Sequence, residues 1–296
     1  MSTILIPLLF VLLWSTGFIF SKFGLPYAEP AGFLALRFGI AALILGALML
    51  VVPRLRPVWP GWQLLAHAAV SGVLLQAVYL GGVFSAISLG ISAGLSSLIV
   101  GLQPLLTVIF AAVILHETLS WQKIAGVVCG LAGVVLVILA RGQLDGSLSV
   151  TGLFFCVAAL LGISVGTVYQ KRFCNTLDLL TGATTQYVAS VAFLLPWVWL
   201  FESGSFDWHP RFVFALSWLV VALSLGAVFL LLWLIRVGEA GRVASLFYLV
   251  PPVVALEAWV LFDEAINAWV VLGTVLCISG VALVALAPSQ QRSPKP

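Results

Sequence analysis

The chain contains no Asp, Glu, Lys or Arg between Pro57 and His116. A soluble domain cannot cover so long a stretch with polar surface, and soluble chains carry about 25% charged residues. This chain carries 8% charged and 62% hydrophobic residues, which also excludes intrinsic disorder, a collagen-like fibre and a secreted disulfide scaffold. The chain must therefore use a lipid bilayer as its solvent, and we predict an all-α polytopic membrane protein.

Ten apolar runs are long enough to cross a membrane, since a spanning helix needs about 20 mainly apolar residues. They cover residues 4–21, 31–52, 62–86, 92–115, 121–140, 150–170, 181–201, 212–235, 243–262 and 268–287. Turn-forming residues such as Pro26, Pro30 and Gly142 separate most of them. Nothing charged marks the turn at residues 88–92; we place a break there because one uninterrupted helix would be far too long for a bilayer.

The distribution of Lys and Arg predicts which way the chain enters the membrane, because cytoplasmic loops retain positive charge. With the N-terminus inside, the outer loops hold three basic residues, Lys22, Arg141 and Arg211. The inner segments hold nine: Arg54, Arg56, Lys123, Lys171, Arg172, Arg236, Arg242, Arg292 and Lys295. We therefore predict that both termini lie in the cytoplasm.

The second half of the sequence repeats the first. Residues 91–140, shifted by 147 positions onto 238–287, give 15 identities in 50. The matched pairs include Pro104 with Pro251, Glu117 with Glu264, Gly126 with Gly273 and Gly133 with Gly280. Proline, glutamate and glycine matches in one register are hard to obtain by chance in apolar sequence, so we predict an internal duplication.

Each half holds five spans, so the second half must enter the membrane upside down. We therefore predict ten transmembrane helices as two inverted five-helix repeats, residues 1–141 and 150–288, followed by a disordered cytoplasmic tail, residues 289–296. Inverted repeats recur in secondary transporters, where rocking one half against the other opens a central site to each side alternately.

Short motifs in both halves resemble EamA-type members of the drug/metabolite transporter superfamily. They are Trp14-Ser-Thr-Gly17-Phe18 with Lys22, Pro30 and Leu36-Arg37-Phe38; Pro104, Leu115-x-Glu117-x-Leu119, Gly126 and Gly133; and Pro251, Phe262-x-Glu264-x-Ile266, Gly273 and Gly280. The sixth span departs from the pattern, since it reads Gly162-Ile-Ser-Val-Gly166, and Gln186 replaces a counterpart of Arg37. The resemblance implies a ten-helix carrier of the bacterial inner membrane, often an exporter of amino acids or other small metabolites.

Helix breakers at corresponding positions of the two halves are the best sequence indication of a carrier's substrate site. Pro104 and the pair Pro251-Pro252 fit that pattern, and a kink made only for packing is the alternative. Polar or aromatic residues near these breaks are the candidates for the substrate-binding lining. They are Trp14, Ser15, Gln76, Tyr79, Ser96, Gln103, Thr107, Ser245 and Tyr248. Hydrogen bonds between helices would explain each of them equally well.

Two charged residues lie inside spans, Arg37 in the second and Glu257 in the ninth. Their depths from the outer membrane surface are similar, which permits an ion pair between the repeats. Such a pair is a candidate outer gate, and Glu257 alone is a candidate for proton coupling; a purely structural pair is the alternative. Glu117 and Glu264 precede the next helix of their repeat, where we expect them to act as helix caps.

These features favour a secondary transporter that exports small organic metabolites by alternating access. No phosphate-binding loop for ATP is present, the four cysteines lack metal-site spacing, and the net charge of +3 is scattered. We expect no enzyme activity, metal, cofactor or nucleic-acid partner; the partners are the bilayer and a small solute. A membrane-embedded enzyme and a non-transporting sensor or channel are the alternatives. Gly126-x-x-x-Gly130 favours tight packing within one chain over a homodimer, but a homodimer stays open.

Overall fold

The computed structural model describes residues 2–55, 60–106, 109–110, 120–144, 149–227, 230 and 247–286. Across these residues every element is helical, and the only extended pairing is an isolated bridge between Ala28 and Phe206. The all-α prediction is therefore confirmed. The expected tail, residues 289–296, lies outside the described residues.

The helices follow the expected spans. In chain order they are α1 (Ser2–Gly24), η1 (Leu25–Tyr27), α2 (Pro30–Val51), η2 (Pro53–Leu55), α3 (Trp62–Gly72), η3 (Val73–Val78), α4 (Tyr79–Ser88), α5 (Ala93–Val100), α7 (Trp121–Leu144), α8 (Val150–Phe173), α9 (Leu179–Phe201), α10 (Pro210–Trp218), η4 (Leu219–Ala227), η5 (Phe247–Leu249), α13 (Val250–Phe262) and α14 (Ala268–Ala285). In the described part of the chain six helical stretches are long and apolar enough to cross a membrane, and four shorter apolar helices fall within the other four runs.

Local sequence explains where these helices start. Ser92 caps α5 by accepting a hydrogen bond from the Leu95 amide at 3.2 Å, and Ser149 caps α8 in the same way. Proline occupies the first turn of α2 and of α10, where its missing N–H costs nothing. The uncharged break between the third and fourth runs is real, since Gly90 adopts a φ of +89° there. A positive φ is the conformation that favours glycine in a tight turn.

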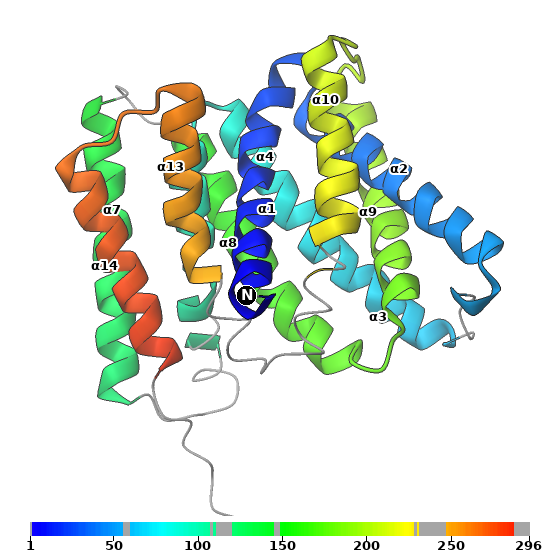
Figure 1. Cartoon of the computed structure of the whole chain (residues 1–296), viewed down its shortest axis with the longest axis horizontal. Helices are drawn as coiled ribbons and strands as arrows, with labels where there is room; N and C mark the ends of the chain where they lie inside the picture. The colour runs from blue at the N-terminus through cyan, green and yellow to red at the C-terminus, as the bar shows by residue number, and fades with distance from the viewer. Residues whose placement is uncertain are drawn as a thin grey trace, which may run out of the picture.

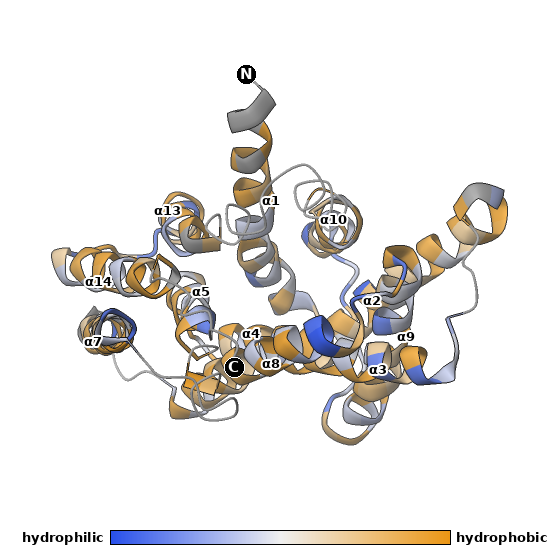
Figure 2. Ribbon diagram, turned by 90° about the horizontal axis from the view of Figure 1, so that it is seen from below, coloured by the Kyte–Doolittle hydropathy of each residue, from blue (hydrophilic) through white to orange (hydrophobic). Residues whose placement is uncertain are grey.

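Figure 1 shows α1 at the front of the bundle, with α13, α14 and α7 on one side and α10, α2 and α9 on the other. Seen from below, α4 and α8 close the rear of this arrangement (Figure 2). The ribbons are coloured mostly as hydrophobic, and many large apolar side chains are exposed, among them Leu50, Trp199 and Leu286. An apolar exterior of this extent is what a lipid-facing surface requires.

The two halves pack through pairs of equivalent helices. In the contact of α7 with α14, the Cys129 thiol donates to the Leu276 carbonyl at 3.4 Å, and the Cys277 thiol donates to the Gly130 carbonyl at 3.3 Å. Each of these bonds joins residues 147 positions apart. A reciprocal contact of this kind is the signature of a two-fold axis.

The glycines of α7 and α14 also make reciprocal contacts between equivalent positions. A Cβ on Gly126 would lie 2.6 Å from the Gly280 carbonyl oxygen, and one on Gly273 would lie 2.7 Å from that of Gly133. The glycine pattern therefore serves close packing within one chain, as expected.

A second equivalent pair, α2 and α9, meets on the same axis. Phe38 and Tyr187 occupy corresponding positions and stack on each other, with ring centroids 5.4 Å apart and planes 8° from parallel. The π-helical segments η3 and η4 also occupy corresponding positions in the two halves. These symmetric contacts agree with two inverted repeats, while the boundaries at residues 141 and 150 stay predictions.

Candidate functional site

The seam between α1 and α13 carries two polar contacts that cross from one repeat to the other. The Ser15 hydroxyl donates to Glu257 Oε1 at 2.8 Å, and the Lys22 ammonium donates to Glu264 Oε1 at 2.8 Å. Both contacts join residues 242 positions apart, so the segments run in the same direction with polar pairs seven residues apart. An α-helix rises about 1.5 Å per residue, which separates the two pairs by about 10 Å.

Glu257 is only half satisfied at this seam. Its Oε1 accepts the bond from Ser15, whereas its Oε2 is buried and has no hydrogen-bond partner among the described residues. A carboxylate inside a membrane bundle is costly unless it is paired, and such residues mark ion, proton or substrate pathways. Glu257 can therefore accept a proton or a hydrogen bond from a solute at Oε2.

Arg37 lies elsewhere in the bundle, and the expected ion pair with Glu257 is not formed. Arg37 is buried on α2, and its Nε donates to the Ser224 hydroxyl on η4 at 3.0 Å. The Tyr187 hydroxyl donates to the Ser224 carbonyl at 3.0 Å. Although the span boundaries predict similar depths for Arg37 and Glu257, α2 packs against α9 and η4 while α13 packs against α1 and α5. The two side chains therefore face different parts of the bundle.

The other predicted lining residues divide into two groups. Trp14 joins an aromatic cluster with Phe10 and Phe247, with the Trp14 and Phe247 rings 5.2 Å apart, and Gln103 donates to the Thr167 hydroxyl at 3.0 Å. These contacts join different helices near the helix breaks.

The remaining described candidates are Ser96, Tyr79 and Gln76. Ser96 is fully buried and accepts a weak bond from the Cys156 thiol at 3.8 Å, Tyr79 is buried in the core, and Gln76 is half-buried in η3. The Ser96 contact favours a structural role for that residue. Thr107 and Ser245 lie outside the described residues, as does the side chain of Tyr248.

The predicted helix breaks are present and touch each other. In the first repeat α5 ends at Val100, and a turn at Gly101 precedes Pro104. In the second repeat η5 precedes α13, whose first turn contains Pro251 and Pro252, so these prolines begin a helix rather than kink its middle. Pro251 Cγ lies 2.9 Å from where a Cβ on Gly101 would stand. The two interrupted spans therefore meet between the repeats.

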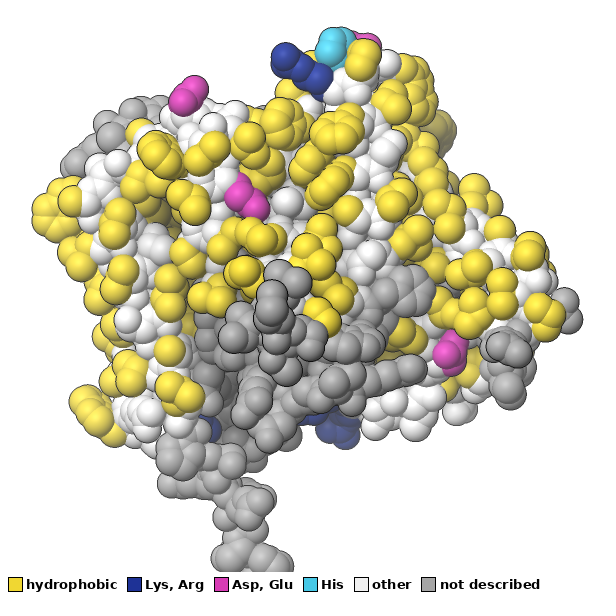
Figure 3. Space-filling model, in the orientation of Figure 1, with side chains coloured by type: hydrophobic (Ala, Val, Ile, Leu, Met, Phe, Trp, Pro, Cys, Tyr) yellow, Lys and Arg dark blue, Asp and Glu magenta, His cyan; other side chains and the backbone are white. Residues whose placement is uncertain are grey.

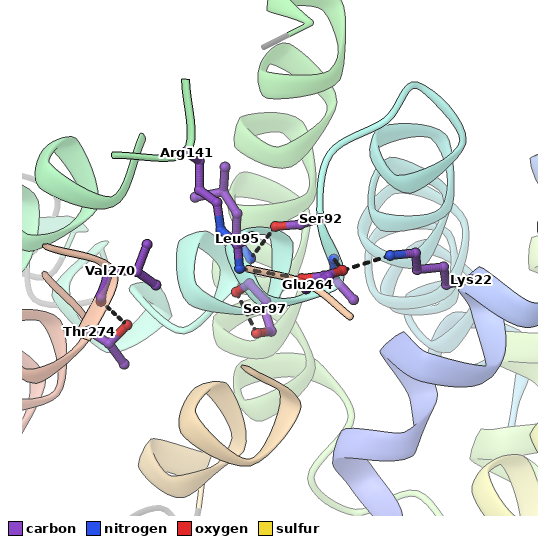
Figure 4. Close-up of polar contacts among 10 residues, drawn as sticks. Lys22, Ser92, Leu95, Ser97, Arg141, Glu264, Val270 and Thr274 are labelled. Carbon is purple, nitrogen blue, oxygen red and sulfur yellow. Dashed lines mark hydrogen bonds and ion pairs between the residues drawn. The ribbon is translucent and has the colours of Figure 1, made fainter. Parts of the chain in front are cut away.

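Glu264 forms the centre of a buried charge cluster that the sequence did not reveal (Figure 4). Its carboxylate accepts from Lys22 at 2.8 Å, from Arg141 Nη2 at 3.4 Å and from the Ala93 amide at 3.1 Å. Glu264 and Arg141 are 8% and 2% exposed, so both charges are withdrawn from water. We call Lys22, Arg141 and Glu264 the Glu264 cluster.

The role expected for Glu264 as the cap of the following helix is wrong. Its carboxylate caps α5, whose first residue is Ala93, whereas Asn267 caps α14 by accepting from the Val270 amide at 2.9 Å. Sequence proximity favoured α14, but the chain turns back so that the carboxylate reaches a helix of the other repeat. Glu117, its repeat counterpart, lies outside the described residues.

The Glu264 cluster also shows which helix ends lie together. It gathers the ends of α1, α7 and α13 and the start of α5 at one end of the bundle. We call this the outer end, because the distribution of basic residues predicts that it faces outward. Glu202 adds a second link there, since its two carboxylate oxygens accept from the Ala31 and Gly32 amides at the start of α2, each at 2.8 Å.

Known proteins match this chain along nearly all of its length. The model of the EamA-like transporter family matches residues 1–139 and 150–286. The uncharacterized transporter YvbV of Bacillus subtilis (strain 168) is 28% identical over 98% of this chain and 94% of its own length. A probable amino-acid metabolite efflux pump of Escherichia coli (strain K12) is 26% identical over 93% of this chain and 92% of its own length. One solved crystal structure is 26% identical and superposes with a TM-score of 0.63, covering 94% of both chains.

Proposed function

Because the chain belongs to the EamA-like transporter family, we propose that it is a secondary carrier that exports small organic metabolites across the bacterial inner membrane. Amino acids or related compounds are the proposed cargo, and the similarity to a probable amino-acid metabolite efflux pump supports that class. The two repeats rock against each other, so that a site between them opens to each side in turn. Both termini lie in the cytoplasm in this arrangement.

The meeting of the two helix breaks is the observation that carries this proposal. The turn at Gly101 and the start of α13 at Pro251 pack together although they belong to opposite repeats. Interrupted helices leave backbone carbonyls without an intrahelical partner, and these can bind a solute where they line a cavity. Gln103 and Trp14 lie next to the breaks and supply polar and aromatic contacts to the same region.

Glu257 is the proposed coupling residue. Its Oε2 is buried without a partner, and Ser15 holds its Oε1 in place from the other repeat. Binding and release of a proton at this carboxylate change the charge on the seam between α1 and α13. A seam that moves during the cycle can therefore couple export to the proton gradient.

The Glu264 cluster is the proposed outer closure, in place of the expected pair of Arg37 and Glu257. Two cations of the first repeat, Lys22 and Arg141, hold one carboxylate of the second. Opening the outer end must break these contacts. Separating a buried ion pair leaves uncompensated charge unless water reaches it, so the cluster favours the closed outer end until water enters.

Inside-out membrane vesicles test the proposed function. Labelled amino acids are offered to vesicles with and without a proton gradient that makes the lumen acidic, and a carrier that exchanges solute for protons accumulates at least one of them only when the gradient is present. Gln103→Ala, beside the helix breaks, should reduce accumulation without reducing the amount of folded protein. Gln122→Ala is the matched control, because Gln122 is bonded to the Leu283 carbonyl away from the breaks.

Two outcomes would contradict the proposal. Entry of solute that ignores the gradient and does not saturate would indicate a channel. Chemical conversion of the solute by the purified protein would indicate an enzyme.

A further inference from the structure

A cavity of about 750 Å³ opens at the outer end, apart from the helix breaks. Residues from α1, η1, α4, α10 and α13 line it, among them Lys22, Phe23, Tyr27, Arg211, Phe214 and Phe262. Ligand pockets for small molecules usually measure about 300–1,000 Å³ and combine an apolar lining with a few polar groups. The cavity has the volume of such a pocket, and it is open to the outside rather than enclosed.

The charge of this cavity is one-sided. Lys22 and Arg211 line it, and its described lining includes no carboxylate. Glu264 lies close to it, but that carboxylate already serves both Lys22 and Arg141. Asp207 and Asp263 lie beside the lining residues Tyr27 and Phe262, but the charged side chains that line the cavity itself are Lys22 and Arg211, so its interior favours an anion.

Lys22 is held in a fixed position in which its ammonium can donate a further hydrogen bond to a ligand. Its ammonium lies 2.8 Å from Glu264 Oε1 and 4.4 Å from the centre of the Phe262 ring, and its side chain is 30% exposed. An ammonium has three N–H donors, and Glu264 is its one described hydrogen-bond acceptor. Lys22 can therefore donate to a second carboxylate without leaving the first.

Arg211 is the second basic residue that lines the cavity. It lies in the first turn of α10, where its amide donates to His209 Nδ1 at 3.2 Å. The His209 ring stacks on Tyr27, with centroids 4.7 Å apart and planes 6° from parallel. Figure 3 shows basic, histidine and acidic side chains at the upper tip of α10, above a surface of hydrophobic side chains. A guanidinium is a planar fork that fits a carboxylate with two parallel hydrogen bonds.

We propose that this cavity is a second solute site, on the exit side of the carrier, and that it binds organic carboxylates with an apolar or aromatic body. Lys22 and Arg211 hold the carboxylate, and the body packs against the rings of Phe23, Phe214 and Phe262. The role as an exit site rests on the proposed function, whereas the binding itself does not. A phospholipid headgroup offers a similar anion, so the experiment separates the two sources.

The test is a fluorine NMR titration of the full-length protein in nanodiscs of phosphatidylcholine, which carries no net charge. The probes are para-fluorophenylacetate and its neutral isostere para-fluorophenylacetamide. The acid should bind at least about tenfold more tightly, because a charge-assisted pair is roughly twice as strong as a neutral hydrogen bond. Arg211→Gln should weaken binding of the acid about tenfold, and Arg211→Lys should weaken it less. Arg172→Gln is the matched control, since Arg172 is exposed like Arg211 but does not line the cavity.

Three results would overturn the inference. They are equal affinity for acid and amide, affinity for the acid that Arg211→Gln leaves unchanged, and loss of acid binding in nanodiscs that contain phosphatidylglycerol. The last result would assign the cavity to an anionic lipid. Failure of the proposed function is a different result, because vesicles would then show no driven accumulation while the purified protein still bound the acid.

Discussion

At the scale of single residues, Glu257 is the strongest candidate for a residue that binds and releases a proton. Its Oε1 is fixed by Ser15 and its Oε2 is buried without a described partner. Hydrogen bonding between helices accounts for one oxygen of this carboxylate and not for the other. An ionisable group in that position, on a seam between the repeats, is suited to exchange a proton during transport.

Glu257→Gln should abolish the dependence of transport on the proton gradient, because an amide has the same shape but cannot release a proton. Accumulation in inside-out vesicles should fall to the level measured without a gradient, while solute exchange at equal concentrations continues. Ser15→Ala is the control, since it removes the bond to Oε1 and keeps the carboxylate; it should retain gradient dependence. Gradient-driven accumulation by the Gln variant would rule Glu257 out as the coupling group.

The sequence could not predict which neighbouring helix each candidate side chain faces. The depth of Arg37 and of Glu257 is readable from span boundaries, but the helix that each side chain faces depends on the packing of all spans. The same limit applies to Glu264, whose partners come from the ends of α1, α5 and α7. Lys22 and Glu264 both belong to the motifs that resemble the family, and this is the sequence signal that could have drawn attention to the cluster.

At the scale of helices, apolar length and turn chemistry carry most of the information. The turn at Gly90, the serine cap of α5 and the proline that begins α2 are all local signals, and the helices break or start at these residues. The position of α13 differs from expectation, because Pro251 and Pro252 lie in its first turn rather than inside a longer helix. Proline is readily accepted in a first turn, where no N–H is needed.

The contact of α7 with α14 gives a stability prediction. Gly133→Ala would place a Cβ 2.5 Å from the Gly273 carbonyl oxygen, so the two helices must move apart. We expect a loss of about 1–3 kcal/mol of stability, the usual cost of overpacking. Thermal unfolding in detergent measures it. Gly46→Ala is the matched control, because nothing lies within 4 Å of its Cβ position on α2; it should be neutral or stabilising by up to about 1 kcal/mol. Equal stability of both variants would contradict this description of the contact.

At the scale of the whole molecule, the symmetric contacts explain how a duplicated sequence can form two similar halves around one axis. Equivalent helices meet across the axis at Phe38 and Tyr187 and again between α7 and α14. The Glu264 cluster, however, joins the repeats at one end of the bundle. A two-fold arrangement closed at one end by ion pairs predicts that weakening those pairs shifts the molecule toward the state that is open at that end.

Accessibility of a cysteine at the helix breaks tests alternating access most directly. Gln103→Cys is labelled with a membrane-impermeant thiol reagent from each side in turn, and the parent chain with its four native cysteines gives the background. Adding Glu264→Gln should raise labelling from the outer side and lower it from the inner side, whereas adding Asp263→Asn, at an exposed neighbour in the same loop, should change neither. Reciprocal changes are the result that this account predicts. Labelling that rises from both sides together, or that does not respond to Glu264→Gln, would contradict it.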